Sequence, residues 1–180
     1  LVFLLDVSGS MDAPDKLDLV KRAFLTMTEN LKDGDSVSIV TYASSDKVVL
    51  DGASGSDRTR IMTAIENLEA GGSTAGSKGI KTAYELAEKH FIKGGNNRVI
   101  LATDGDLNVG VTSEGGLTRL IQKKRKSGVF LSVLGFGTGN IKDNKMEALA
   151  DNGNGQYAYI DSMAEARKVL VEEMGGTLFT

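Results

Sequence analysis

The chain opens with a continuous apolar run that passes directly into acid and hydroxyl side chains. Residues 1–5 read LVFLL and residues 6–10 read DVSGS, so Asp6, Ser8 and Ser10 stand at alternate positions. An apolar run without polar alternation is typical of a strand covered on both faces, as in a parallel sheet packed between helices. Ligands of open α/β sheets bind beyond the carboxyl ends of such strands. We therefore expect these three side chains to line a ligand crevice.

The three side chains offer only hard oxygen ligands. Carboxylate and hydroxyl oxygens suit Mg²⁺, Mn²⁺ or Ca²⁺, whereas zinc and copper favour nitrogen and sulfur. The chain has no Cys and a single His, His90. Disulfides and thiolate sites are therefore excluded, and His90 lacks the partners of a zinc site.

Apolar periodicity predicts strands alternating with helices along the rest of the chain. After a turn at 11–16, helices are expected at 17–31, 57–68, 80–91, 117–126, 145–151 and 163–174, and strands at 36–42, 47–50, 98–103, 129–134 and 156–160. In the first two helices the predicted inward residues are Leu17, Val20, Phe24, Met27, Leu31, Ile61, Met62, Ile65 and Leu68. Such alternation predicts a doubly wound α/β fold, with helices on both faces of a mostly parallel central sheet and one antiparallel edge strand at 47–50.

Two further loops are expected at the crevice of the opening strand. Strand 98–103 delivers Asp104 at its end, and the Gly/Ser-rich segment 70–79 carries Thr74. If the opening strand and strand 98–103 are neighbours where the winding of the sheet reverses, their loops leave in opposite directions and open a crevice. Asp104 and Thr74 would then join the acid and the serines of the first loop.

This donor set has a physical logic. Mg²⁺ takes six oxygens at about 2.0–2.1 Å and keeps several waters. Neutral hydroxyls as direct ligands leave its charge poorly quenched, and carboxylates can act from outside by holding coordinated waters. A cation held in this way would accept an acidic side chain from another molecule.

At these residues the sequence resembles a known family. Asp6-x-Ser8-x-Ser10, Thr74 in GGST and Asp104 in TDG are similar to the five-part metal-ion-dependent adhesion site of von Willebrand factor A domains. The resemblance covers the whole chain. It implies that Ser8, Ser10 and Thr74 contact the metal, that Asp6 and Asp104 hold it mostly through water, and that a ligand carboxylate completes the octahedron. It also implies a non-enzymatic protein-binding domain for adhesion or assembly, loaded with Mg²⁺ (Mn²⁺ or Ca²⁺ as alternatives), whose protein partner presents an Asp or Glu carboxylate.

Several segments look especially like bacterial members of that family, namely VSGSM, AGGSTAGSKGI, ATDGDLNVG and GFGTGNIKDNKMEALADNGNGQYAYID. This resemblance implies a protein of the cell envelope or the exterior, often lipoprotein-anchored. The chain begins inside a predicted strand without an initiator Met, so we expect residues 1–180 to be one domain of a longer protein. No run approaches the roughly 18 apolar residues of a spanning helix, so we expect no direct membrane insertion by this domain.

A rim around the predicted site is expected to receive the ligand. Its candidate residues are Met11, Asp12, Ser73, Gly105 and Asp106. Gly9 and Gly105 would let the backbone turn sharply beside the site. Asp12 and Asp106 also fit a simpler interpretation as solvated loop acids, and the loop around Thr74, with Ser73 and Ser77 nearby, could be a glycine-rich connector.

Specific sequence features argue against several other classes of function. A net charge of −3 argues against nucleic-acid binding, and the basic run at 123–126 fits a helix end better than a nucleic-acid contact. The turn DVSGSM has one Gly where a dinucleotide fold needs G-x-G-x-x-G, and GGSTAGSK has a Ser between the second Gly and the Lys of a P-loop. Ser8 replaces the second acid of a D-x-D phosphohydrolase. The alternatives left open are a metal-dependent phosphohydrolase that uses the same crevice and a structural module with a vestigial metal site.

Overall fold

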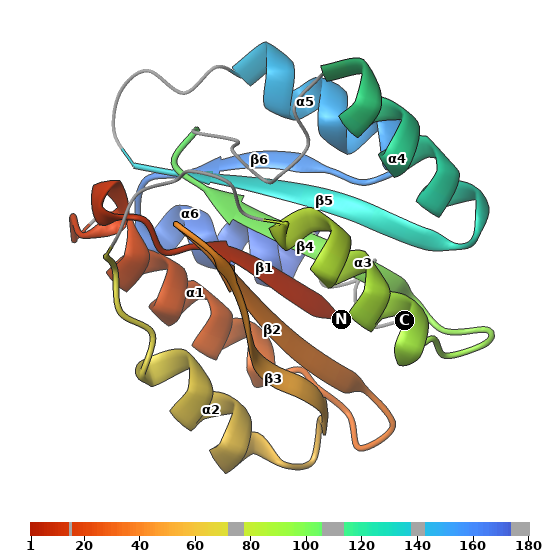
Figure 1. Ribbon diagram of the computed structural model, residues 1–180. Helices are drawn as coiled ribbons and strands as arrows, with labels where there is room; N and C mark the ends of the chain where they lie inside the picture. The colour runs from red at the N-terminus through yellow and green to blue at the C-terminus, as the bar shows by residue number, and fades with distance from the viewer. Residues whose placement is uncertain (15, 72–77, 106–113, 138–142, 174–180) are drawn as a thin grey trace.

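The computed structural model describes residues 1–14, 16–71, 78–105, 114–137 and 143–173 (Figure 1). Strands and helices alternate along these residues. Their order is β1 (Val2–Asp6), η1 (Gly9–Met11), α1 (Leu17–Thr28), β2 (Ser36–Tyr42), β3 (Asp46–Ser54), α2 (Arg58–Glu66), α3 (Gly79–Lys89), β4 (Asn97–Thr103), α4 (Glu114–Lys126), β5 (Val129–Phe136), α5 (Asp143–Asn152), β6 (Tyr157–Ile160), α6 (Met163–Arg167) and η2 (Lys168–Glu173).

The strands form one six-stranded sheet in the order β3-β2-β1-β4-β5-β6. All neighbouring pairs are parallel except β2 with β3, which is antiparallel at the edge. Helices α1, α2 and α6 cover one face, and α3, α4 and α5 cover the other (Figure 1). The predicted doubly wound α/β fold is confirmed, including the edge strand, which runs over Asp46–Ser54 and is longer than expected.

Strand β1 lies at the centre of the sheet and is buried along its whole length. Phe3 and Leu5 pack into the core beneath α1, α2 and α6, whereas Val2 and Leu4 pack into the core beneath α3, α4 and α5. The rings of Phe3 and Phe24 stack with centroids 4.3 Å apart. The unbroken apolar run of β1 therefore follows from its having a helical layer on each side.

Two sequence predictions about helices are wrong in part. Met62 was expected to face inward but is 41% exposed, because it follows the buried Ile61 by one residue and so points about 100° away around α2. The single closing helix expected at 163–174 is instead a short α-helix, α6, followed by the π-helical segment η2. Val169 and Leu170 of η2 are nevertheless buried in the core beneath α1.

A membrane span is not found among the described helices, none of which is both long and apolar enough to cross a bilayer.

The core assignment can be checked by comparing two truncations of large apolar side chains. Phe24→Ala should lower the free energy of unfolding by about 3–5 kcal/mol, because it empties a fully buried site and removes the stack with Phe3. Met62→Ala should change it by less than about 0.5 kcal/mol, since that side chain is largely exposed. Urea unfolding of both variants measures the difference, and equal losses would contradict the packing described here.

Candidate metal centre

Three of the predicted ligands at the carboxyl end of β1 are linked by hydrogen bonds through Ser8. The Asp6 side chain is fully buried, and its Oδ1 accepts hydrogen bonds from the Ser8 backbone N–H at 2.9 Å and from the Ser8 hydroxyl at 2.6 Å. The Oγ atoms of Ser8 and Ser10 are 3.0 Å apart. A carboxylate that accepts from the residue two positions on closes a local turn, and η1 continues it with a bond from the Met11 N–H to the Ser8 carbonyl at 2.9 Å.

Backbone hydrogen bonds bring the beginning of the Gly/Ser-rich segment to the same place. Val7 donates to the Tyr42 carbonyl at 3.0 Å, and Gly71 donates to the Val7 carbonyl at 2.8 Å. The chain therefore enters this segment directly beside the first loop. Thr74 and Ser73, three and two residues further on, lie outside the described residues, as does Asp106.

Asp104 follows β4 at the same end of the sheet, where the parallel strands have their carboxyl ends. Leu5 of β1 is paired with Ala102 of β4, so both strands end together. Gly105 has a φ of +113°, which favours glycine, and its N–H donates to the Thr103 hydroxyl at 3.2 Å. The expected sharp turn at Gly105 is confirmed, whereas Gly9 lies in the 3₁₀ turn η1.

An ion pair that sequence reasoning missed joins this edge to the start of α1. Lys16 Nζ lies 3.2 Å from Asp104 Oδ2, and the Asp104 side chain is only 7% exposed. The sequence signal that could have found it is a lysine immediately before a predicted helix, where a residue that accepts hydrogen bonds is usual.

The structure describes three of the five predicted rim residues, Met11, Asp12 and Gly105. Asp12 is exposed and Gly105 is partly buried at the edge of the site. Met11 was expected on the rim, but its side chain is 0% exposed and packs into the core with Leu17. The reason is that η1 turns this apolar side chain inward, where it buries more apolar surface than a rim position would allow.

The two serine oxygens are hydrogen-bonded to each other, and their spacing also suits two adjacent ligands of a small divalent cation. In an octahedron with metal–oxygen distances of about 2.0–2.1 Å, adjacent ligand oxygens are about 2.9 Å apart, close to the 3.0 Å between Ser8 Oγ and Ser10 Oγ. Among the described residues, no three His, Cys, Asp or Glu side chains gather closely enough to hold a metal by themselves. A cation here would therefore depend on the hydroxyl oxygens.

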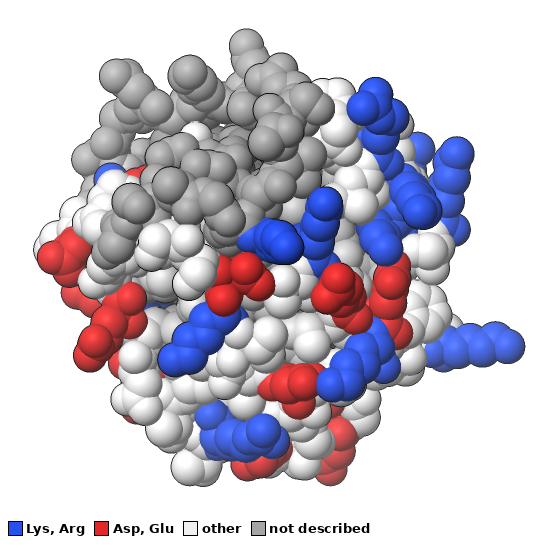
Figure 2. All heavy atoms as spheres, in the orientation of Figure 1, with Lys and Arg blue, Asp and Glu red and all other residues white. Residues whose placement is uncertain are grey.

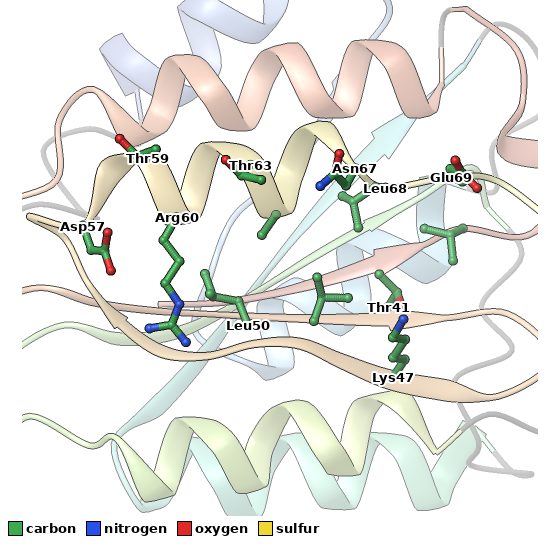
Figure 3. Close-up of a pocket in the computed structure, with 13 residues that line it drawn as sticks. Thr41, Lys47, Leu50, Asp57, Thr59, Arg60, Thr63, Asn67, Leu68 and Glu69 are labelled. Atoms are coloured by element: carbon green, nitrogen blue, oxygen red, sulfur yellow. The ribbon is translucent and has the colours of Figure 1, made fainter.

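A separate hollow lies away from this site, between α2 and β3 (Figure 3). It has a volume of about 890 Å³ and a mixed lining. Its two acids, Asp57 and Glu69, stand at opposite ends (Figure 3). They are too far separated to share one cation, so this hollow is not a second metal centre.

Two other features singled out in the sequence have structural explanations. Basic side chains gather over the last turn of α4 (Figure 2), where they complement the helix dipole. Lys124 in this turn pairs with Glu88. His90 ends α3 and bonds Asp51 at 2.6 Å. Hydrogen bonds from Lys89 and His90 hold the pKa of the Asp51 carboxyl below its ordinary value.

Comparison with known proteins identifies the family. The model of the von Willebrand factor type A domain matches residues 1–173. The chain belongs to the von Willebrand factor type A family. The expected resemblance is thus confirmed, and a solved structure of this family, the SpRpn10 VWA domain, shares the fold with a TM-score of 0.68 over 94% of this chain and 92% of that one, at 17% identity.

Relatives of this von Willebrand factor type A domain come from bacteria and mammals. The chain is 45% identical over its whole length to "Uncharacterized protein YfbK" of Escherichia coli, of which it spans 31%. It is 29% identical over its whole length to the human inter-alpha-trypsin inhibitor heavy chain H3, of which it spans 21%. The crystal structure of BatB from Bacteroides thetaiotaomicron has the same fold, with a TM-score of 0.76, 22% identity and coverage of 97% and 96% of the two chains. The chain thus spans less than a third of these two sequence relatives.

The hydrogen bonds of the first loop lead to a test on this von Willebrand factor type A domain alone. Ser8→Ala should lower the free energy of unfolding by about 1–3 kcal/mol, because the buried Asp6 carboxylate loses its hydroxyl donor. Ser10→Ala should change it by less than about 0.5 kcal/mol, because Ser10 is exposed. Both are measured by denaturant unfolding in EDTA, so that no divalent cation contributes. A loss of the same size in both variants would contradict the described loop.

Proposed function

We propose that this domain binds one divalent cation, Mg²⁺ with Mn²⁺ or Ca²⁺ as alternatives, and thereby binds an acidic side chain of a partner protein. Von Willebrand factor type A domains generally mediate protein–protein interaction and are mostly not enzymes. The observation that carries the proposal is the pair of serine hydroxyls, held 3.0 Å apart beside a buried carboxylate. When bound, the cation supplies an electrophilic position that a carboxylate can fill.

In this proposal some residues contact the cation directly and others hold it through water. Ser8, Ser10 and Thr74 are proposed as the direct ligands, with Asp6 and Asp104 acting mostly through water. Because the Ser8 hydroxyl donates to Asp6, its oxygen keeps lone-pair density for other interactions. The same hydrogen bond positions Ser8 against Ser10.

The proposed location is the cell envelope or the exterior. This proposal rests on the resemblance to bacterial members of the family, which also implies a lipoprotein type of anchor outside this domain. Proteins that share the fold include an aerotolerance-related membrane protein of Bacteroides fragilis and the PilB minor pilin of Streptococcus sanguinis, at 21% and 16% identity.

Cation binding should appear as thermal stabilisation. A ligand that binds only the folded state at one hundred times its dissociation constant adds about 2.7 kcal/mol, roughly 5–10 °C in the melting temperature of a domain of this size. We expect Mg²⁺ or Mn²⁺ to produce such a rise in the unmodified chain. Asp104→Ala and Ser8→Ala should abolish it, because each removes a member of the site.

Asp33→Ala is the matched control. It removes one exposed carboxylate in the turn before β2, at the opposite edge of the sheet, and should keep the full rise. A domain whose melting temperature does not respond to either cation would be the vestigial module, and the proposed metal centre would be wrong.

Partner binding and catalysis can be separated in the same samples. Capture of a partner by this domain should require Mg²⁺ and be lost in EDTA and in Asp104→Ala. It should also be inhibited by free glutamate, because the partner's carboxylate and glutamate would compete for one position. Generic phosphatase substrates should not be turned over. Turnover that survives repurification and vanishes in Asp6→Asn would instead favour the phosphohydrolase.

A further inference from the structure

The ammonium group of Lys16 lies at the edge of the proposed metal centre. Its Nζ is 3.2 Å from Asp104 Oδ2, and the two side chains are 24% and 7% exposed. Because the pair is largely shielded from water, its attraction is screened less than that of an exposed surface pair. The negative charge of the Asp104 carboxylate is therefore compensated by the ammonium group of Lys16.

The requirements of α1 do not explain a lysine at this position. Lys16 occupies the N-cap of the helix and makes no capping hydrogen bond from its side chain. Ser, Thr, Asp and Asn are preferred at N-caps, and a cation there meets the positive end of the helix dipole. The contact of Lys16 with Asp104 is thus the interaction that accounts for its charge.

The stem of Lys16 is also held from the side of β5. Gly137 follows that strand with a φ of +109°, and a Cβ added to it would lie 3.0 Å from Lys16 Cε and 3.5 Å from Lys16 Cγ. The aliphatic stem therefore runs against bare backbone, and a larger residue at 137 would press on it. This contact helps to direct the ammonium towards Asp104.

We propose that Lys16 sets the charge of the proposed metal centre by neutralising Asp104. This inference rests on the proposed function. With the carboxylates of Asp6 and Asp104 and the ammonium of Lys16, a bound divalent cation leaves the cluster with one net positive charge, which one external carboxylate balances. Asp12 is exposed, so water and salt screen its charge. Lys16 thus weakens cation binding but strengthens the binding of an acidic ligand to the loaded centre.

The test is Lys16→Met, which keeps the stem and removes the charge. Mn²⁺ is the probe for the cation, titrated calorimetrically and by its electron paramagnetic resonance signal. Acetate is the probe for the acidic ligand, followed by the broadening of its ¹³C resonance by bound Mn²⁺. We expect Mn²⁺ to bind about tenfold more tightly and acetate to bind about tenfold more weakly than in the unmodified chain.

Lys93→Met is the matched control. It removes one exposed positive charge in the turn before β4, at the far edge of the sheet, and should leave both constants unchanged. Lys16→Gln is the second variant, used if Lys16→Met does not fold, and it should show the same opposite changes.

The outcomes separate the inference from the function on which it rests. If the unmodified chain does not bind Mn²⁺, the proposed function fails. If it binds Mn²⁺ but removal of the Lys16 charge leaves both constants within twofold, or moves both in the same direction, the inference is overturned. Equal changes in Lys93→Met would also overturn it, because net charge alone would then explain them.

Discussion

The pairing of β1 with both β2 and β4 is the constraint on which the proposed metal centre depends. Leu5 is paired with Thr41 on one side and with Ala102 on the other, so three strands end at one edge. Because the chain winds away from β1 in opposite directions, the loops at this edge separate instead of covering one another. A strand that could not be buried on both faces would not occupy this central place, and the acid at its end would not reach the crevice.

The two carboxylates at this edge are compensated in different ways. Asp6 is fully buried and accepts hydrogen bonds from the Ser8 backbone and hydroxyl, which are neutral donors. Asp104 is nearly buried and pairs with the ammonium of Lys16. Both arrangements offset the cost of removing a charge from water. Only the first leaves a full negative charge in the cluster, so the two acids are not equivalent towards a cation.

The apolar pattern was sufficient to predict the fold because burial on one or two faces has a definite period. The unbroken run of β1 and the three-and-four spacing of α1 each indicated which layers must cover them, and both predictions are confirmed. Met62 was mispredicted because a methionine beside Ile61 is as apolar as its neighbour, and only the helix axis decides which of the two is buried. The placement of Met11 on the rim was wrong for a related reason, because a turn can direct an apolar side chain inward.

The candidate site was harder to predict from the sequence than the fold. The spacing of Asp6, Ser8 and Ser10 brings them together within one turn, so local geometry is enough. Lys16 is 88 residues from Asp104 in the chain, so a lysine before a predicted helix could draw attention to Lys16 but could not identify Asp104 as its partner. From the N-cap of α1, that side chain pairs with Asp104, just after β4, and its stem runs beside Gly137, just after β5. Replacing it therefore alters packing as well as charge. A packing change alone would be expected to weaken the binding of both the cation and its acidic ligand, whereas a charge change must strengthen one and weaken the other.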